Sequence, residues 1–131
     1  MIRSRSLLAR AALTLTLAAA PRAWAQDPAA VNADTIRVKL ENDRVRVLEA
    51  TLPPGTKEKT HSHPAYVIYV LTGGKFRNHA ADGKVTEGEF KSGDVIYREP
   101  LTHFAENIGD TTIQLILVEL KGGSAPPPKV R

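Results

Sequence analysis

The sequence contains no cysteine. Disulfides, thiolate metal sites and cysteine nucleophiles are therefore all excluded. An oxidising compartment would be tolerated by this chain, but it would add no covalent cross-link. Helical periodicity is missing as well, since no segment after residue 25 repeats its apolar residues every three to four positions over a useful length. A helical bundle is not expected.

An excess of positive charge is also missing once the first 25 residues are set aside. The net charge of +4 comes from 18 basic and 14 acidic side chains. Four of the basic residues, and none of the acidic ones, lie in the first 25 positions, so residues 26–131 carry 14 of each sign. A balanced charge gives no reason to expect nucleic acid or a charged membrane surface as a partner.

The first 25 residues have the order of segments that is typical of a secretory signal peptide. A basic start is followed by an apolar run over 11–20 and by the small-x-small pattern Ala23-Trp24-Ala25. The apolar run is too short to span a bilayer, although an N-terminal membrane anchor is the alternative interpretation. We expect Sec-type export, cleavage after Ala25, a periplasmic or secreted protein, and no stable membrane span after processing.

Beyond residue 25 the apolar residues have the two-residue period of β-strands. Residues 35–40 alternate Ile36, Val38 and Leu40 with polar neighbours, and Gly, Pro and Asp turns separate the later runs. Many short, closely spaced strands favour an all-β sandwich or barrel. The predicted strands lie at 35–40, 45–49, 66–71, 75–79, 85–91, 95–98, 103–107 and 111–120. We expect a single barrel domain over 35–121, an N-terminal extension over 26–34 and a disordered Gly- and Pro-rich tail over 122–131.

Three of the four histidines have a spacing that suits a metal site. His61 and His63 are two residues apart, so in a strand both imidazoles project from the same face. His103 follows a predicted turn at the start of a later strand and is the best third candidate. A lone His-x-His pair is often just an exposed strand face, and His79, before a turn, is expected to be exposed.

The surrounding residues resemble the two motifs of the cupin superfamily. Gly55-x5-His61-x-His63, ending in Gly74, resembles the first motif, and Gly93-Asp94 followed by His103-x3-Asn107 resembles the second. The resemblance covers about half of the residues after position 25. It implies a cupin-type jelly-roll barrel, or double-stranded β-helix, with one metal ion held by the three histidines in its wider mouth.

The chain departs from the family pattern at its acidic ligand. The first motif normally supplies a glutamate after the second histidine, and by spacing and parity Val67 occupies that position. Three neutral imidazoles leave the full +2 charge on a divalent ion, so the site should favour anionic ligands. It resembles the three-histidine sites of cupin dioxygenases. Iron, zinc, manganese, nickel and copper all suit this ligand set, and a site that has lost its metal is the alternative.

Two function classes follow from this reading. The first is a metal-dependent oxygenase acting on a small organic molecule, with Tyr69 pointing into the mouth as proton donor or substrate contact. Alternatively, Tyr69 is an aromatic residue that only fills the barrel. Of Tyr97 and Arg98, which flank the turn of the second motif, one is expected to reach the pocket. The second class is a non-catalytic cupin module that binds a small molecule or a metal. Exposed barrel edges make a homodimer the expected assembly.

Overall fold

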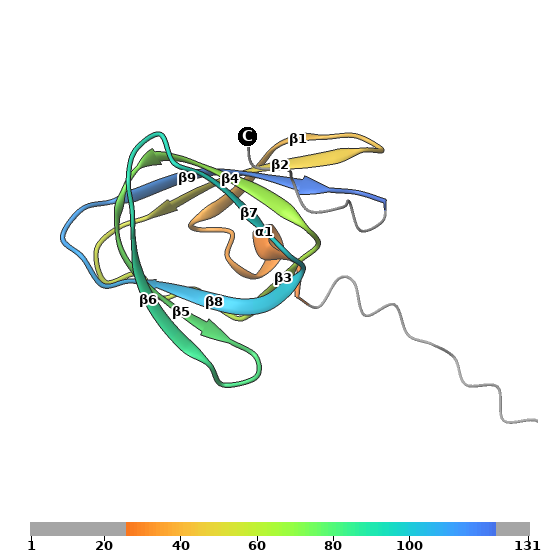
Figure 1. Ribbon diagram of the computed structural model, residues 1–131. Helices are drawn as coiled ribbons and strands as arrows, with labels where there is room; N and C mark the ends of the chain where they lie inside the picture. The colour runs from red at the N-terminus through yellow and green to blue at the C-terminus, as the bar shows by residue number, and fades with distance from the viewer. Residues whose placement is uncertain (1–25, 123–131) are drawn as a thin grey trace, which may run out of the picture.

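The computed structural model describes residues 26–122. The predicted signal peptide and the tail from residue 123 onward lie outside these residues. Within them, a single short helix precedes nine strands (Figure 1). The elements are α1 (Pro28–Val31), β1 (Ile36–Glu41), β2 (Val45–Leu52), β3 (His61–His63), β4 (Tyr66–Thr72), β5 (Gly74–Ala80), β6 (Val85–Phe90), β7 (Val95–Arg98), β8 (Leu101–Asn107) and β9 (Ile113–Leu120).

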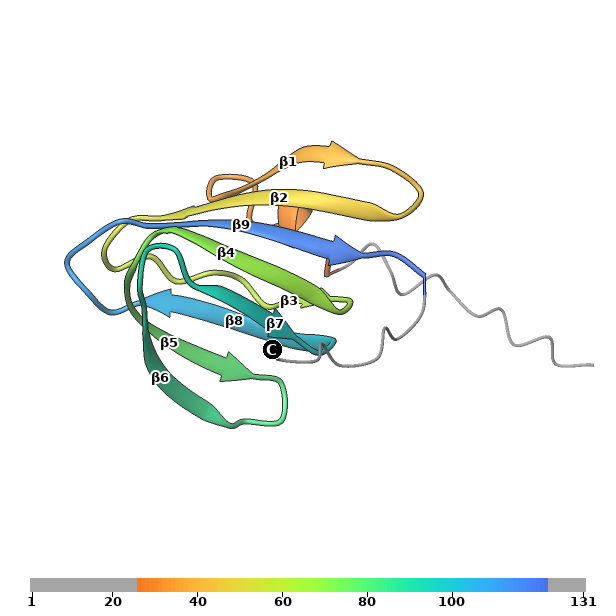
Figure 2. The ribbon, with the colours of Figure 1, turned by 45° about the horizontal axis from the view of Figure 1, so that its top comes forward.

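The strands form two antiparallel sheets that face each other as the two walls of a barrel (Figure 2). One sheet has the order β1-β2-β9-β4-β7 and the other the order β3-β8-β5-β6. Strands distant in sequence are therefore neighbours, as where β2 and β4 both pair with β9. The all-β barrel predicted from the two-residue period is confirmed.

The hydrophobic core belongs to the five-stranded sheet. Within residues 26–122, the cluster of buried apolar residues lies entirely on β1, β2, β4 and β9. Alternate side chains of β2, β4 and β9 point inward, and β1 contributes Ile36. The four-stranded sheet adds only partly buried apolar residues to this core, among them Phe76, Phe90 and Leu101. Its buried side chains are polar, and they include all three candidate metal ligands. The barrel interior thus has an apolar wall and a polar wall.

The predicted N-terminal extension contains α1 and packs on the polar wall. Asp27 caps this helix by accepting a hydrogen bond from the Ala30 amide at 2.9 Å, and Pro28 at the first helical position suits a helix start. The Ser62 amide in β3 donates to the Gln26 carbonyl at 2.8 Å. The extension is therefore part of the fold that holds β3.

No helix among the described residues is long and apolar enough to cross a membrane.

Candidate metal centre

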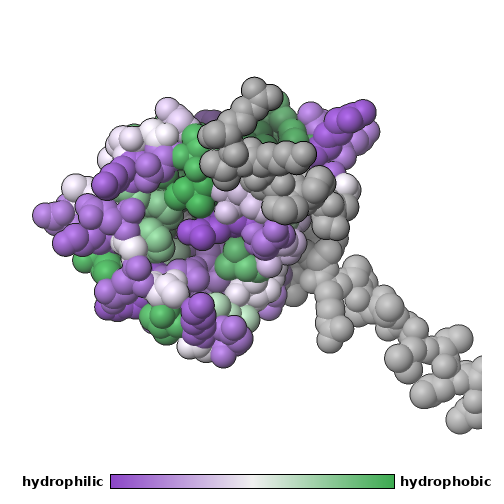
Figure 3. All heavy atoms as spheres, in the orientation of Figure 1, coloured by the Kyte–Doolittle hydropathy of each residue, from purple (hydrophilic) through white to green (hydrophobic). Residues whose placement is uncertain are grey.

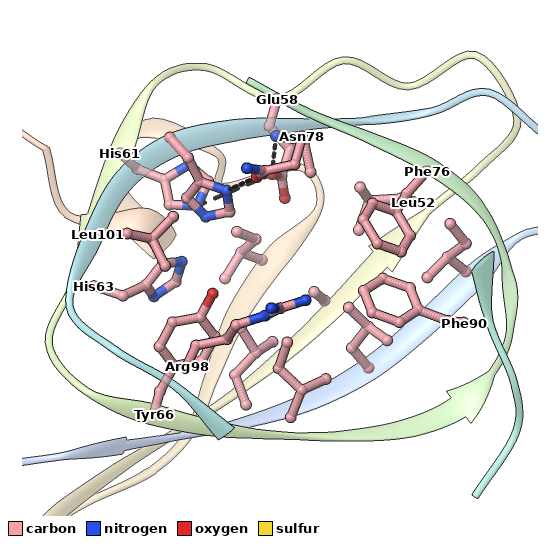
Figure 4. A pocket seen from close by; sticks show the side chains of 18 of the residues that line it. Leu52, Glu58, His61, His63, Tyr66, Phe76, Asn78, Phe90, Arg98 and Leu101 are labelled. Atoms are coloured by element: carbon pink, nitrogen blue, oxygen red, sulfur yellow. Dashed lines mark hydrogen bonds and ion pairs between the residues drawn. The ribbon is translucent and has the colours of Figure 1, made fainter. Parts of the chain in front are cut away.

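The barrel brings the three predicted histidines together at one point. β3 pairs with β8 so that His61 lies opposite His103, and the strand period places His63 on the same face as His61. One nitrogen from each ring lies within 4.8 Å of the other two. All three side chains are buried, and Figure 4 shows His61 and His63 pointing into the same cavity. The ring centroids are 4.7 Å apart for His61–His63 and 4.7 Å for His61–His103.

Each imidazole is oriented by an acceptor at its outer nitrogen. The Nδ1 of His63 lies 2.7 Å from Glu119 Oε1, and that of His61 lies 2.8 Å from the Lys59 carbonyl. The Nδ1 of His103 contacts Asn78 Oδ1. For His63 and His103 the oxygen acceptor requires the hydrogen on Nδ1, which leaves the lone pair on Nε2. The Nδ1 of His61 also lies 3.1 Å from the side-chain amide nitrogen of Asn32, so only the Lys59 carbonyl favours the same tautomer there. Metal-bound histidines in proteins are held in this way.

One inner nitrogen of the cluster lacks the partner that a metal-free role would need. The Nε2 of His103 is buried and has no hydrogen-bond partner among the described residues. Leaving such an atom unpaired in the interior is unfavourable by about 1–3 kcal/mol. A divalent cation bound by the three Nε2 atoms would satisfy it, and three histidines are a common ligand set for such ions. The residues present therefore fit a metal ion.

Burial also keeps two of the rings in the protonation state that a ligand needs. It lowers the pKa of His61 to about 4, against a smaller opposing effect of the hydrogen bond to Lys59. Burial and the neighbouring rings of His61 and His63 lower the pKa of His103 to about 3. Both rings are neutral at pH 7, and metal binding requires neutral imidazole.

A chain of charged side chains connects this centre to the N-terminal extension. Glu119, which accepts from His63, is buried, and its other oxygen lies 3.6 Å from Arg46 Nη1. Arg46 in turn forms an ion pair with Asp27, the residue that caps α1. On the other side of the site, Asn32 Oδ1 accepts from the Lys59 amide at 2.7 Å. Sequence reasoning missed these supporting residues because their partners are distant in the chain.

A buried carboxylate, also missed by sequence reasoning, lies beside the histidines. Glu58 Oε2 is 3.9 Å from His61 Nε2 and accepts a hydrogen bond from the Ala105 amide at 3.0 Å. Burial raises its pKa to about 7, and the hydrogen bond from Ala105 opposes this. The family motif directs attention to positions after His63, whereas this carboxylate precedes His61. Glu58 is a neighbour of the three-histidine cluster, but it is not one of the residues whose ligand atoms all lie within 4.8 Å of one another.

The prediction that Tyr69 points into the mouth is wrong. Its side chain is 46% exposed on the outer face of β4, and the inward positions of that strand are Tyr66, Ile68 and Val70. The parity of β3 does not continue into β4, because residues 64 and 65 interrupt the strand. For the same reason Val67 does not share the face of the histidines. Tyr66 is the tyrosine of the site, and its ring stacks on His63 at a centroid distance of 4.5 Å.

The histidines line one end of a cavity of about 440 Å³ inside the barrel. Of the two candidates at the second motif, Arg98 lines this cavity and Tyr97 does not. The rest of the lining is largely apolar and includes Phe76, Phe90 and Leu115. On the face shown in Figure 3, the surface of the described residues is mostly hydrophilic, with hydrophobic residues visible between the polar ones.

His79 lies outside the cluster, as predicted. Its ring stacks on Phe104 at a centroid distance of 4.2 Å, and Nε2 lies 3.3 Å from Glu106. It is half-buried by these contacts, so the expectation of an exposed residue is only partly met.

No family sequence model matches this chain, and a search among curated proteins finds no match. Solved structures do resemble it. A cupin domain from Bordetella pertussis is 28% identical with a TM-score of 0.61, over 66% of this chain and 92% of that one. A double-stranded β-helix protein from Klebsiella pneumoniae is 27% identical with a TM-score of 0.53, over 67% and 72%. A predicted oxalate decarboxylase from Thermotoga maritima is 26% identical with a TM-score of 0.50, over 66% and 78%. The chain has the fold of these small cupin domains, with three histidines clustered inside its barrel.

Proposed function

We propose that this protein is a metal-dependent cupin enzyme that acts as an oxygenase on a small organic molecule. One divalent ion is held by the Nε2 atoms of His61, His63 and His103. The observation that carries the proposal is the convergence of three buried imidazoles whose Nδ1 atoms are already engaged by acceptors. A cavity large enough for a small organic molecule opens directly onto them.

The chain's own residues would bind, orient and shield the reacting groups. Glu119, Asn78 and the Lys59 carbonyl fix the imidazoles, which reduces the reorganisation needed when the ion binds. The apolar part of the lining would favour an apolar group over water. A redox-active ion in this ligand set supplies dioxygen chemistry, and a redox-inert one supplies Lewis acidity. Glu58 and Tyr66 are the side chains next to the histidines that can hold a proton.

The largely apolar lining also favours a second function, a non-catalytic module that holds a small molecule or the metal. Decarboxylation of oxalate, suggested by the name of the Thermotoga protein, suits this lining less well because oxalate has no apolar part. The cupin fold itself does not decide between these functions.

Anaerobic purification with metal analysis, followed by oxygen-uptake assays on a substrate panel that includes oxalate, separates them. An oxygenase should contain a redox-active metal and consume oxygen with at least one compound. The His103→Ala variant should lose this activity, and the His79→Ala variant should keep it. Tight ligand binding without turnover would contradict the enzyme and support the module.

Export to the periplasm or the medium remains part of the proposal. It is supported by the sequence of residues 1–25, which has the order of segments typical of a secretory signal peptide. Cleavage after Ala25 would leave the hydrogen bond from the Ser62 amide to the Gln26 carbonyl in place.

We further propose that two copies associate through the outer face of the five-stranded sheet. An in-register apolar row crosses all five strands of that sheet. Its residues are Leu40, Val47, Val118, Val67 and Tyr97. A two-fold axis would pack this row against its own copy. Light scattering should give a dimer mass for the wild type and a monomer mass for Val118→Lys, whereas a monomeric wild type would contradict the proposal.

A further inference from the structure

Arg98, a cationic side chain of the cavity lining, has no carboxylate partner among the described residues 26–122. Arg98 ends β7, next to Tyr66 of β4, and in Figure 4 its guanidinium extends between Tyr66 and Phe90. Arg46 and Arg77 each pair with carboxylates. Arg98 is a solvent-exposed residue of the cavity lining, so the cavity presents a positive charge with which a ligand can pair.

The charge of Arg98 acts at the histidine end of the cavity. Arg98 lies opposite Tyr66 in the sheet, the ring of Tyr66 stacks on His63, and Arg98, Tyr66 and the three histidines line the same cavity. Arg98 and the histidine cluster thus border the same space. An anionic group placed there would contact the guanidinium and lie near the three Nε2 atoms at once.

The opposite end of the cavity is built for an apolar group. Phe76 and Phe90 stack with ring centroids 4.1 Å apart, and both are only partly buried by protein. Gly88 permits this arrangement, because a Cβ atom there would lie 2.8 Å from Phe76 Cζ. Ile113 and Leu115 also line the cavity, from the facing sheet. The whole cavity, at 440 Å³, is about three times the 150 Å³ of an apolar cavity that admits one benzene.

We propose that the ligand of this cavity is an organic carboxylate with an apolar body. Its carboxylate pairs with Arg98 beside the histidines, and its aryl or alkyl body packs on Phe76 and Phe90. A guanidinium can bind a carboxylate through two parallel hydrogen bonds, so arginine suits this task better than lysine. This inference rests on the proposed function at one point: it takes the bound carboxylate to be the molecule on which the metal centre acts.

Calorimetry on the zinc-loaded protein tests the proposal without requiring activity. The probes are phenylacetate and hexanoate, with phenylacetamide as the neutral match and acetate as the anion without an apolar body. We expect phenylacetate or hexanoate to bind at least tenfold more tightly than each of the two comparison compounds. Arg98→Gln should weaken phenylacetate or hexanoate about tenfold and phenylacetamide little, as expected for the loss of one ion pair of about 1.4 kcal/mol. Arg77→Gln, at a partly exposed arginine of β5 that does not line the cavity, is the matched control and should change the affinity for none of these compounds.

The outcomes separate this inference from the metal function. Zinc binding that is retained in Arg98→Gln, with unchanged affinity for both carboxylates, would overturn the carboxylate subsite and leave the metal site standing. Failure of the wild type to bind either carboxylate, or equal binding of acetate, would also overturn the subsite. Carboxylate binding that depends on Arg98 in a protein that binds no zinc would support the subsite and contradict the metal function.

Discussion

Replacing Glu58 by glutamine should change how the stability of the metal-free protein depends on pH. Burial raises the pKa of Glu58 from its ordinary 4.5 to about 7. Because its pKa is higher in the folded protein than in the unfolded chain, the stability that Glu58 contributes is complete below pH 4.5. That stability is lost as the pH rises to about 7. At about 1.4 kcal/mol per pH unit, the loss is on the order of 3 kcal/mol.

The buried histidines have the opposite effect on stability. Burial lowers the pKa of His61 to about 4 and that of His103 to about 3, below the ordinary 6.5. Their contribution is therefore complete above pH 6.5 and is lost as the pH falls towards these values. In the wild type, protonation of Glu58 in the folded state offsets part of this loss. Glu58→Gln removes the offset while keeping an acceptor for the Ala105 amide.

Urea unfolding of EDTA-treated protein between pH 4 and pH 8 measures both effects. Relative to the wild type, Glu58→Gln should gain about 3 kcal/mol of unfolding free energy on going from pH 4 to pH 8. Its stability should also fall more steeply below pH 6.5. Glu89→Gln, an exposed residue of β6, is the control and should give a curve parallel to the wild type. Parallel curves for Glu58→Gln and the wild type would refute the assignment of a buried, largely protonated carboxyl at this position.

Three further predictions concern the support of the site, the core and processing. Glu119→Gln should lower zinc affinity by about 10–100-fold in calorimetry, because Glu119 orients His63. The outer-face variant Glu49→Gln is the control and should keep the wild-type affinity. Equal zinc affinities of Glu119→Gln and the wild type would count against this role. Leu48→Ala should lower the unfolding free energy by about 2–5 kcal/mol in urea, since Leu48 is fully buried, and a loss below about 1 kcal/mol would contradict its place in the core. N-terminal sequencing of exported protein should begin at Gln26, and because Trp24 is the only tryptophan, the processed protein should show no tryptophan emission; an intact leader would contradict this.

The fold and the histidine cluster were predictable because they depend on local periodicity and on short motifs. Alternation of apolar residues specifies strands, and two histidines separated by one residue share a strand face wherever the strand lies. The position of Tyr69 was mispredicted because parity holds only within an uninterrupted strand, and residues 64 and 65 separate β3 from β4. Alternation within β4 alone places Tyr66 and Tyr69 on opposite faces but does not say which face points inward. The packing of the sheets decides that Tyr66 does.

The residues that surround the ligands could not be predicted in this way. Glu119 reaches His63 from β9, and Asn78 reaches His103 from β5, so both contacts depend on how the two sheets assemble. Glu58 lies in no regular strand and enters the barrel through hydrogen bonds with Ala105. The choice of Arg98 over Tyr97 follows from the phase of a four-residue strand, which its sequence leaves open.

The central claim is that His61, His63 and His103 bind one metal ion, and a zinc titration of single alanine variants tests it most directly. Each of these histidines would supply one of three protein ligands, so each replacement should lower the affinity by more than the 10–100-fold typical of supporting residues. His79→Ala is the matched control, because His79 contacts Phe104 and Glu106 away from the cluster, and it should bind one zinc ion like the wild type. Equal, weak binding by the wild type and all four variants would contradict the claim and leave a metal-free barrel.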